Sequence, residues 1–174
     1  MRARERHVEG VRSNVHVLGH PVHPVLVLFP VAFLVGALVT DLVYLGTADV
    51  TWAAFSYWLL WAGLVTGIVA ALTGAVDFLL IPRVRATSWG WVHMVGNLLV
   101  LVLAAVNVGI RVPDLAITGG ALASGVVLSA IIAATLVVTG WAGGELVYRH
   151  RVAVLPARAE RPPRAAPGEE RPAA

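Results

Sequence analysis

The sequence predicts an all-α membrane protein, a bundle of four transmembrane helices. Of its 174 residues, 58% are hydrophobic and 13% are charged. A soluble domain has about 45–50% apolar and about 25% charged residues. The charged residues gather at the two ends and in short connections, which leaves four long apolar runs. Each run reaches the roughly 20 residues that a helix needs to cross a hydrocarbon core.

The first two helices are expected at about residues 24–45 and 52–81. Pro24 suits a first helical position because its missing N–H would be unpaired there in any case. Asp41 lies near the end of the first run, and Asp77 lies about one turn before the end of the second. Both runs are too long for barrel strands of about 9–11 residues, so helices are predicted.

The other two helices are expected at about residues 88–110 and 115–144. The third run carries no charge, and the fourth finishes in a glycine-rich stretch before Glu145. Because the connections between the runs are short, consecutive helices should be antiparallel neighbours.

Three regions follow from this pattern: a polar N-terminal segment (1–18), the four-helix domain (19–155) and a C-terminal tail (156–174). The N-terminal segment is expected to be mobile or to lie on the membrane surface. The tail consists mainly of Pro, Arg, Ala and Glu, and this composition predicts disorder.

Arginine sets the expected orientation, since the chain has no lysine. Twelve of the 13 arginines fall before the first helix, between the second and third, or after the fourth. The positive-inside rule then places both termini on the cytoplasmic side of the inner membrane, in a multi-pass arrangement. Arg111, beside Asp114, falls on the other side. The basic pI reflects this topology, so the expected partner is the lipid bilayer and not nucleic acid.

The chain has no cysteine, which excludes disulfides, thiolate metal sites and iron–sulfur clusters. The sequence also shows no nucleophile–base pattern and no phosphate-binding loop, so an enzyme is not the favoured interpretation.

Up-and-down threading brings six ionisable residues to the cytoplasmic end: His20, His23, Asp77, His93, Glu145 and His150. Pro21 and Pro24 favour extended geometry for the two histidines before them. In a polyproline II segment those imidazoles would project to one side, about 9 Å apart. This distance is too long for both to bind one ion, so the segment supplies one ligand or simply a rigid helix entrance.

His93 and Asp77 are expected at similar depths on neighbouring helices. His93 is a candidate haem ligand, metal ligand or proton carrier, and equally a packed hydrogen-bonding residue. Asp77 should pair with His93 or with an arginine of the 82–87 loop, because a charge at this depth needs a partner. Asp77 would either bind a metal or orient a ligand, or it would form a polar clamp between helices.

Asp41 lies roughly 27 Å from this cluster along its helix, so it is an outer-side residue expected to reach toward water. Gly63, Gly67, Ala71 and Ala75 form a small-residue stripe at i, i+4 spacing. Such a stripe allows close packing of helices, either within the bundle or in a homodimer.

An internal similarity relates the two halves of the chain. Each half would begin with a histidine (His23, His93) and end with a carboxylate (Asp77, Glu145). One interpretation is two parallel repeats about an axis along the membrane normal, although the match needs a one-residue gap.

The chain resembles the bacterial membrane proteins grouped as domain of unknown function 2231. The resemblance rests on His20-Pro-Val-His-Pro24, Phe29-Pro30, Asp41, the stretch 73–77, His93 and the stretch 143–148. It implies a four-helix membrane domain. Some members look to be joined to Rieske-type iron–sulfur domains, which implies an association with electron transfer.

Two functions are therefore expected. The first is a module that binds haem b or a divalent metal ion and serves membrane electron transfer beside a redox partner subunit. Its ligands would be His93 with His23 or His20, supported by Asp77 and Glu145. The alternative is a structural or accessory subunit whose polar cluster locks helix ends and docks a partner. A transporter ranks last, because Pro30 is the one breaker inside a helix.

Overall fold

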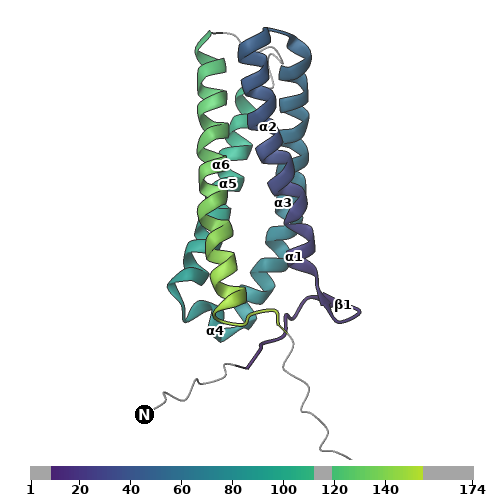
Figure 1. Cartoon of the computed structure of the whole chain (residues 1–174), viewed down its shortest axis with the longest axis vertical. Coiled ribbons are helices and arrows are strands. Elements are labelled where there is room, and N and C mark those ends of the chain that lie inside the picture. The colour runs from purple at the N-terminus through teal and green to yellow at the C-terminus, as the bar shows by residue number, and fades with distance from the viewer. Residues whose placement is uncertain (1–8, 112–118, 155–174) are drawn as a thin grey trace, which may run out of the picture.

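The computed structural model of this chain describes residues 9–111 and 119–154, with the backbone alone for 119–123. Four long helices run up and down beside one another (Figure 1). The elements are β1 His16–Val17, β2 His20–Pro21, α1 Val22–Leu26, α2 Leu28–Thr47, α3 Val50–Leu80, α4 Pro82–Arg85, α5 Ser88–Arg111 and α6 Gly119–Tyr148.

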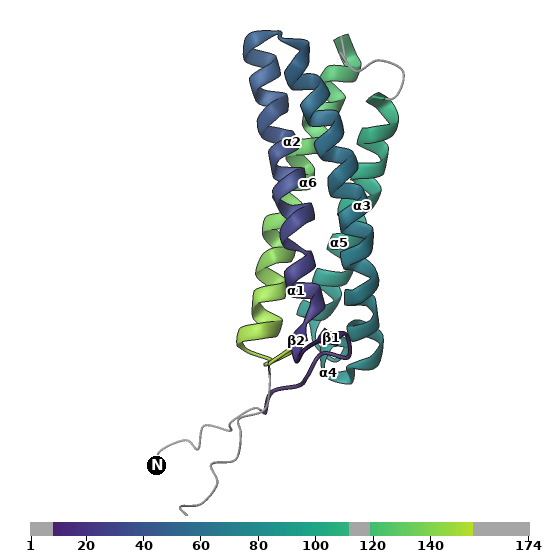
Figure 2. The ribbon, with the colours of Figure 1, turned by 90° about the vertical axis from the view of Figure 1, so that its right-hand side faces the viewer.

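The predicted four-helix membrane fold is confirmed by four helices that are long and apolar enough to cross a bilayer. Helices α1 and α2 together make the first span, and α3, α5 and α6 make the others. Helix α2 packs mainly on α3 and α5 mainly on α6, so the bundle consists of two antiparallel hairpins (Figure 2). We call the end where α1 begins and α6 finishes the lower end, and the opposite one the upper end.

Apolar residues and a smaller number of polar residues fill the inside of the bundle, and many large apolar side chains also point outward. The central core consists of Leu34, Ala37, Leu60, Val100, Ala104, Val108 and Ile132. By contrast, Leu72, Val137 and Trp141 are each about two-thirds exposed or more, at 65%, 74% and 68%. This distribution suits a lipid solvent, in which apolar side chains gain nothing by leaving the surface.

Two glycines of the small-residue stripe lie at close helix contacts inside the bundle. A Cβ added to Gly63 would lie 2.6 Å from Cδ2 of Leu34, and one added to Gly67 would lie 2.8 Å from Cδ2 of Leu101. Both glycines therefore let side chains of α2 and α5 pack directly on the backbone of α3. Ala71 and Ala75 are half-buried on the same helix.

The first span is interrupted at Val27, between α1 and α2. Pro30 explains the interruption, because its ring has no N–H for the carbonyl of Leu26 and clashes with it. Helix α1 begins at Val22, with Pro21 as its N-cap residue in an extended conformation (φ −65°, ψ 132°). His23 therefore lies inside the first helical turn, which corrects the expectation of an extended segment that continues to Pro24.

His20 belongs to a small hairpin and not to a continuous polyproline II segment. Strands β1 and β2 pair antiparallel, with Val17 opposite His20. The two residues of the turn, Leu18 and Gly19, have positive φ values of 49° and 83°. Two successive positive φ values are typical of the tight hairpin turns whose twist matches that of paired strands.

Residues 9–21, here called the N-terminal strap, lie across the lower end of the bundle. The Val11 amide donates to the Arg151 carbonyl at 2.9 Å, and Arg83 Nη1 donates to the Glu9 carbonyl at 2.6 Å. Val11 also packs against a buried apolar cluster that includes Phe78 and Val152. The expectation of a mobile or membrane-surface segment is thus wrong for residues 9–18, because backbone donors and an apolar side chain find partners on the bundle.

Candidate functional site

Two histidines from different hairpins meet in the lower half of the bundle. His23 comes from α1 and His93 from α5. Their ring centroids are 6.0 Å apart, and the ring planes are nearly perpendicular at 86°. Both side chains are partly buried. The early helix start at Val22 is what carries His23 to the depth of His93.

Each imidazole uses one nitrogen in the same way. Nδ1 of His23 lies 2.9 Å from the carbonyl oxygen of Ala70, and Nδ1 of His93 lies 2.8 Å from that of Thr139. A carbonyl oxygen only accepts hydrogen bonds, so each Nδ1 must carry the proton and donate it. In the neutral ring Nε2 is then unprotonated, with its lone pair free to bind a metal ion or a proton.

A glycine lies against each imidazole ring. A Cβ at Gly74 would lie 2.7 Å from Cε1 of His23, and a Cβ at Gly143 would lie 3.1 Å from Cε1 of His93. Each glycine follows the accepting carbonyl by one helical turn. The helix therefore offers each ring a flat backbone surface and a hydrogen-bond acceptor.

The two histidine environments are related by a regular sequence offset. His23 and His93 are 70 residues apart, and their glycines, Gly74 and Gly143, are 69 apart. The same offset of 69 places Leu146, and not Glu145, at the position equivalent to Asp77. Asp77 and Glu145 thus correspond only across the one-residue gap that the match between the two halves needs, and one residue on a helix means a different face.

Asp77 binds the N-terminal strap instead of His93 or a loop arginine. Its carboxylate accepts hydrogen bonds from the Ser13 hydroxyl at 2.6 Å and from the Asn14 amide at 2.7 Å. The expectation that Asp77 pairs with His93 or a loop arginine is therefore wrong, because uncharged donors of the strap bind its carboxylate. Asp77 therefore joins α3 to the strap and does not form the expected polar clamp between helices.

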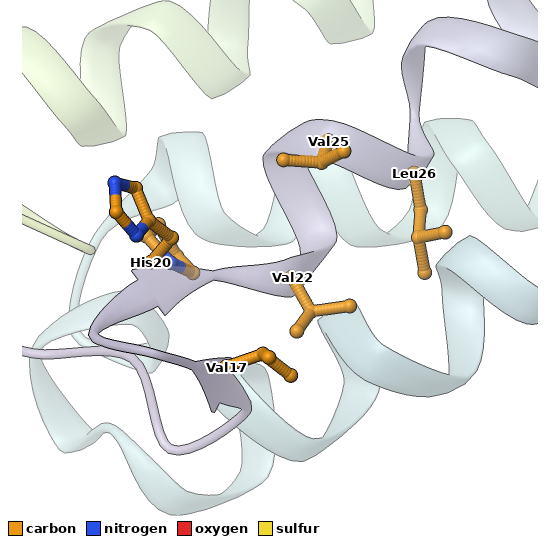
Figure 3. A pocket seen from close by; sticks show the side chains of 6 residues that line it. Val17, His20, Val22, Val25 and Leu26 are labelled. Atoms are coloured by element: carbon orange, nitrogen blue, oxygen red, sulfur yellow. The ribbon is translucent and has the colours of Figure 1, made fainter.

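The remaining candidates at the lower end lie apart from the histidine pair. Glu145 is buried on α6, with Oε2 3.1 Å from Nε of Arg149. His20 is exposed, and its Nδ1 lies 3.2 Å from the carbonyl oxygen of Leu18. Figure 3 shows His20 at the edge of a shallow apolar groove near the start of α1. The His150 carbonyl lies 3.4 Å from Nη1 of Arg83.

A second polar group, which sequence reasoning missed, lies buried near the upper end. Arg111 of α5 forms a two-pronged ion pair with Asp41 of α2, with both N–O distances at 2.8 Å. Each residue is 1% exposed. Asp41 was expected to reach toward water, and this expectation is wrong because the guanidinium satisfies the carboxylate inside the bundle.

Three further polar residues complete this group. Arg111 also donates to Ser56 Oγ at 2.8 Å and to Asn107 Oδ1 at 3.0 Å. Ser129 donates to Asp41 at 2.7 Å and accepts from Asn107 at 2.9 Å. The five side chains come from all four long helices, so we call them the four-helix clamp. Because Asp41 and Arg111 are 70 residues apart, like the two histidines, aligning the halves on the histidines could have revealed this pair.

Residues 19–156 match the sequence family described as Predicted membrane protein (DUF2231). The chain belongs to the DUF2231 family. The match covers both histidines and the four-helix clamp, and it confirms the family that the sequence resembles. No curated protein and no solved structure matches the chain.

This DUF2231 chain therefore carries two polar pairs, each of which joins residues 70 positions apart in the sequence. One pair consists of opposite charges and the other of two identical histidines. Asp41 and Arg111 neutralise each other. With Nδ1 of each ring donating to a carbonyl, the uncharged forms of His23 and His93 would both present an acceptor at Nε2 and could not pair with each other through it. Within residues 9–111 and 119–154, no three His, Cys, Asp or Glu side chains gather into a metal-binding group. The histidine pair thus offers two nitrogen ligands.

Proposed function

We propose that this DUF2231 protein holds a metal centre between His23 and His93, and that the donor set suits haem iron best. The observation that carries the proposal is the matched pair of Nδ1 hydrogen bonds to the carbonyls of Ala70 and Thr139. A hydrogen bond from the second ring nitrogen is the usual way in which proteins orient a ligating histidine and raise its basicity.

The distance between the rings supports this proposal. Two imidazoles that bind one ion from opposite sides, with metal–nitrogen bonds of about 2.0–2.1 Å, have ring centroids roughly 6 Å apart. The centroids of His23 and His93 are 6.0 Å apart.

The number of ligands favours haem over a bare divalent ion. Structural zinc sites use four protein ligands and catalytic ones use three, whereas haem iron takes only one or two axial ligands from the protein, and two histidines can supply both. In the described part of the chain the pair has no third His, Cys, Asp or Glu to complete a metal-binding group. Bound haem would supply one-electron transfer, and the chain would hold it in the inner membrane. The arginine distribution supports a cytoplasmic position for the lower end, where a redox partner would bind.

A structural or accessory role is the second candidate. It is supported by Asp77, which fastens the N-terminal strap to α3 through Ser13 and Asn14. In that role the lower end would present a fixed surface for another subunit.

The deciding experiment is a visible spectrum and a metal analysis of the full chain, purified in detergent from cells supplied with a haem precursor. We expect one haem per chain, lost in both His23→Ala and His93→Ala. His20→Ala is the matched control, because His20 is exposed and belongs to the same His-Pro sequence, so it should retain the haem. A folded preparation without colour or bound metal would exclude the metal centre and leave the structural role.

A further inference from the structure

A second candidate site lies on the outer face of α6 near the lower end. It is a groove of about 480 Å³. The residues that line it are Gly140, Trp141, Gly144, Glu145, Tyr148 and Arg149. Trp141 and Tyr148 are 68% and 83% exposed, so their side chains project from the helix.

The floor of this groove is open because it is made of glycine. Among the described residues, nothing lies within 4 Å of a Cβ built at Gly140, and only Tyr148 approaches one built at Gly144. Gly143, on another face of the same turn, contacts His93 instead. The groove therefore opens outward, away from the histidine pair. In a membrane-spanning helix this surface meets lipid.

Glu145 brings to the groove a carboxylate oxygen that has an ion-pair partner but no hydrogen bond. The residue is 9% exposed, and its Oε2 has no hydrogen-bond partner in the described part of the chain. Nε of Arg149 lies 3.1 Å away as an ion pair, without the geometry of a hydrogen bond. A buried carboxylate oxygen of this kind is costly unless a donor reaches it.

Arg149 supplies the opposite charge at the rim of the groove. Its side chain is 76% exposed. The guanidinium thus remains available to an anionic group, and its planar donors fit phosphate well. The site accordingly combines a buried acceptor with an exposed cation, beside two aromatic rings of the kind enriched at membrane interfaces.

We propose that this groove binds a phospholipid whose head group carries a primary ammonium, as in phosphatidylethanolamine. The side chain of Arg149, whose Nε lies 3.1 Å from the buried Oε2 of Glu145, would turn to bind the phosphate, and the ammonium would take its place as the donor to Oε2. An anionic head group without an amine would meet the Glu145 carboxylate unfavourably. A choline head group has no N–H to donate, so Glu145 discriminates between two lipids that differ only in methylation.

Native mass spectrometry of the full chain tests the proposal, with phosphatidylethanolamine and phosphatidylcholine of identical acyl chains as probes. We expect about tenfold tighter binding of the ethanolamine lipid, the effect of one charge-assisted hydrogen bond. Glu145→Gln should remove most of this preference. Equal binding of the two lipids by the unaltered chain, or stronger binding of phosphatidylglycerol, would overturn the proposal.

Gly140→Leu provides a second variant that fills the groove without disturbing the packing. It should weaken binding of phosphatidylethanolamine about tenfold or more, because a side chain would occupy the floor. Gly109→Leu is the matched control, since a Cβ at Gly109 of α5 also has nothing within 4 Å among the described residues. A chain that dimerises, and loses its dimer in Gly140→Leu, would show that a second copy occupies the groove. Lipid binding and haem absorbance are separate measurements. Either result can therefore contradict its own proposal and leave the other proposal standing.

Discussion

Each end of the bundle carries a side-chain pair whose members are 70 residues apart in the sequence, yet the two pairs meet opposite physical demands. Asp41 and Arg111 have complementary charges and are both buried, and they share hydrogen bonds with three neighbours from the surrounding helices. His23 and His93 are identical, and each is oriented by a backbone carbonyl. The upper pair is complete in itself. The lower pair retains unused Nε2 lone pairs.

This comparison separates stability from binding. A complementary pair lowers the free energy of the folded bundle without any further component. On the proposed function, the two histidines with matched tautomers would need a bound metal centre to use their Nε2 atoms. We therefore expect variants at the upper end to affect mainly unfolding, and variants at the lower end to affect mainly ligand content.

The largest effect is expected for the four-helix clamp. Arg111→Met and Asp41→Leu each leave one buried charge without its partner, which costs about 3–5 kcal/mol. The double variant should cost less than either single change, because it removes both charges together. Thermal unfolding in detergent measures the three variants. Additive losses would show that the two residues act independently.

Gly74→Ala should produce the next largest effect, and it should change both stability and haem content. The new Cβ would lie 2.7 Å from the His23 ring, so the ring must move, at a cost of about 1–3 kcal/mol. Gly143→Ala should cost less, since the corresponding distance to His93 is 3.1 Å. Unfolding temperature and bound haem should both fall, and further in Gly74→Ala. The reverse order would contradict the contacts described for the two rings.

Removal of an imidazole should affect stability less than removal of a clamp residue. In His93→Ala the Thr139 carbonyl loses one hydrogen bond, a loss of about 0.5–1.5 kcal/mol. The bound metal centre, by contrast, should be lost completely. Parallel measurement of unfolding and visible absorbance checks this separation. A loss of stability as large as that of Arg111→Met would remove the distinction between the two ends.

The strap can be loosened without disturbing the bundle. Ser13→Ala removes one hydrogen bond to Asp77 and should make the strap open about five times more often, the effect of roughly 1 kcal/mol. Limited proteolysis of the strap measures the opening. His16→Ala, at an exposed position of the same strap, is the control. Equal cleavage of all three proteins would show that Asp77 does not hold the strap.

The smallest effect should come from Asp49, the N-cap of α3. Hydrogen bonds from the Thr51 backbone and side chain hold the pKa of this carboxyl below its ordinary value. A depressed pKa in the folded state means that the stabilisation is present above the pKa of the unfolded chain and is lost as pH falls through the folded-state pKa. Asp49→Ala should therefore lower the unfolding temperature slightly at neutral pH and have no effect at strongly acidic pH. An equal effect at both would contradict this assignment.

Hydropathy predicted the number of spanning helices because each span is defined by its own residues. The pairings between helices could not be predicted in that way. Arg111 was placed just outside the third helix, because local hydropathy says nothing about a partner 70 residues away in the sequence. His20 was grouped with His23 because the sequence does not show where the turn at Leu18 and Gly19 directs the chain.

The end of the bundle at which His93 lies followed from helical rise and antiparallel threading, whereas its meeting with His23 did not, because a helix that starts at Pro24 would leave His23 at the level of the helix cap. The partner of Asp77 did not follow either, because it lies in a polar segment that was expected to be mobile. Local patterns thus identify which polar residues need partners, and the register between helices decides which partners they find.

The hydrogen bond from Val11 to Arg151 has a consequence for how the protein is made. The N-terminal strap is synthesised before the four long helices, yet the backbone it binds follows α6. The strap therefore cannot dock until α6 has emerged, and Asp41 likewise waits for Arg111. We expect the strap to wait at the aqueous boundary while the helices are made, so that residues synthesised before the four helices reach their final positions after them.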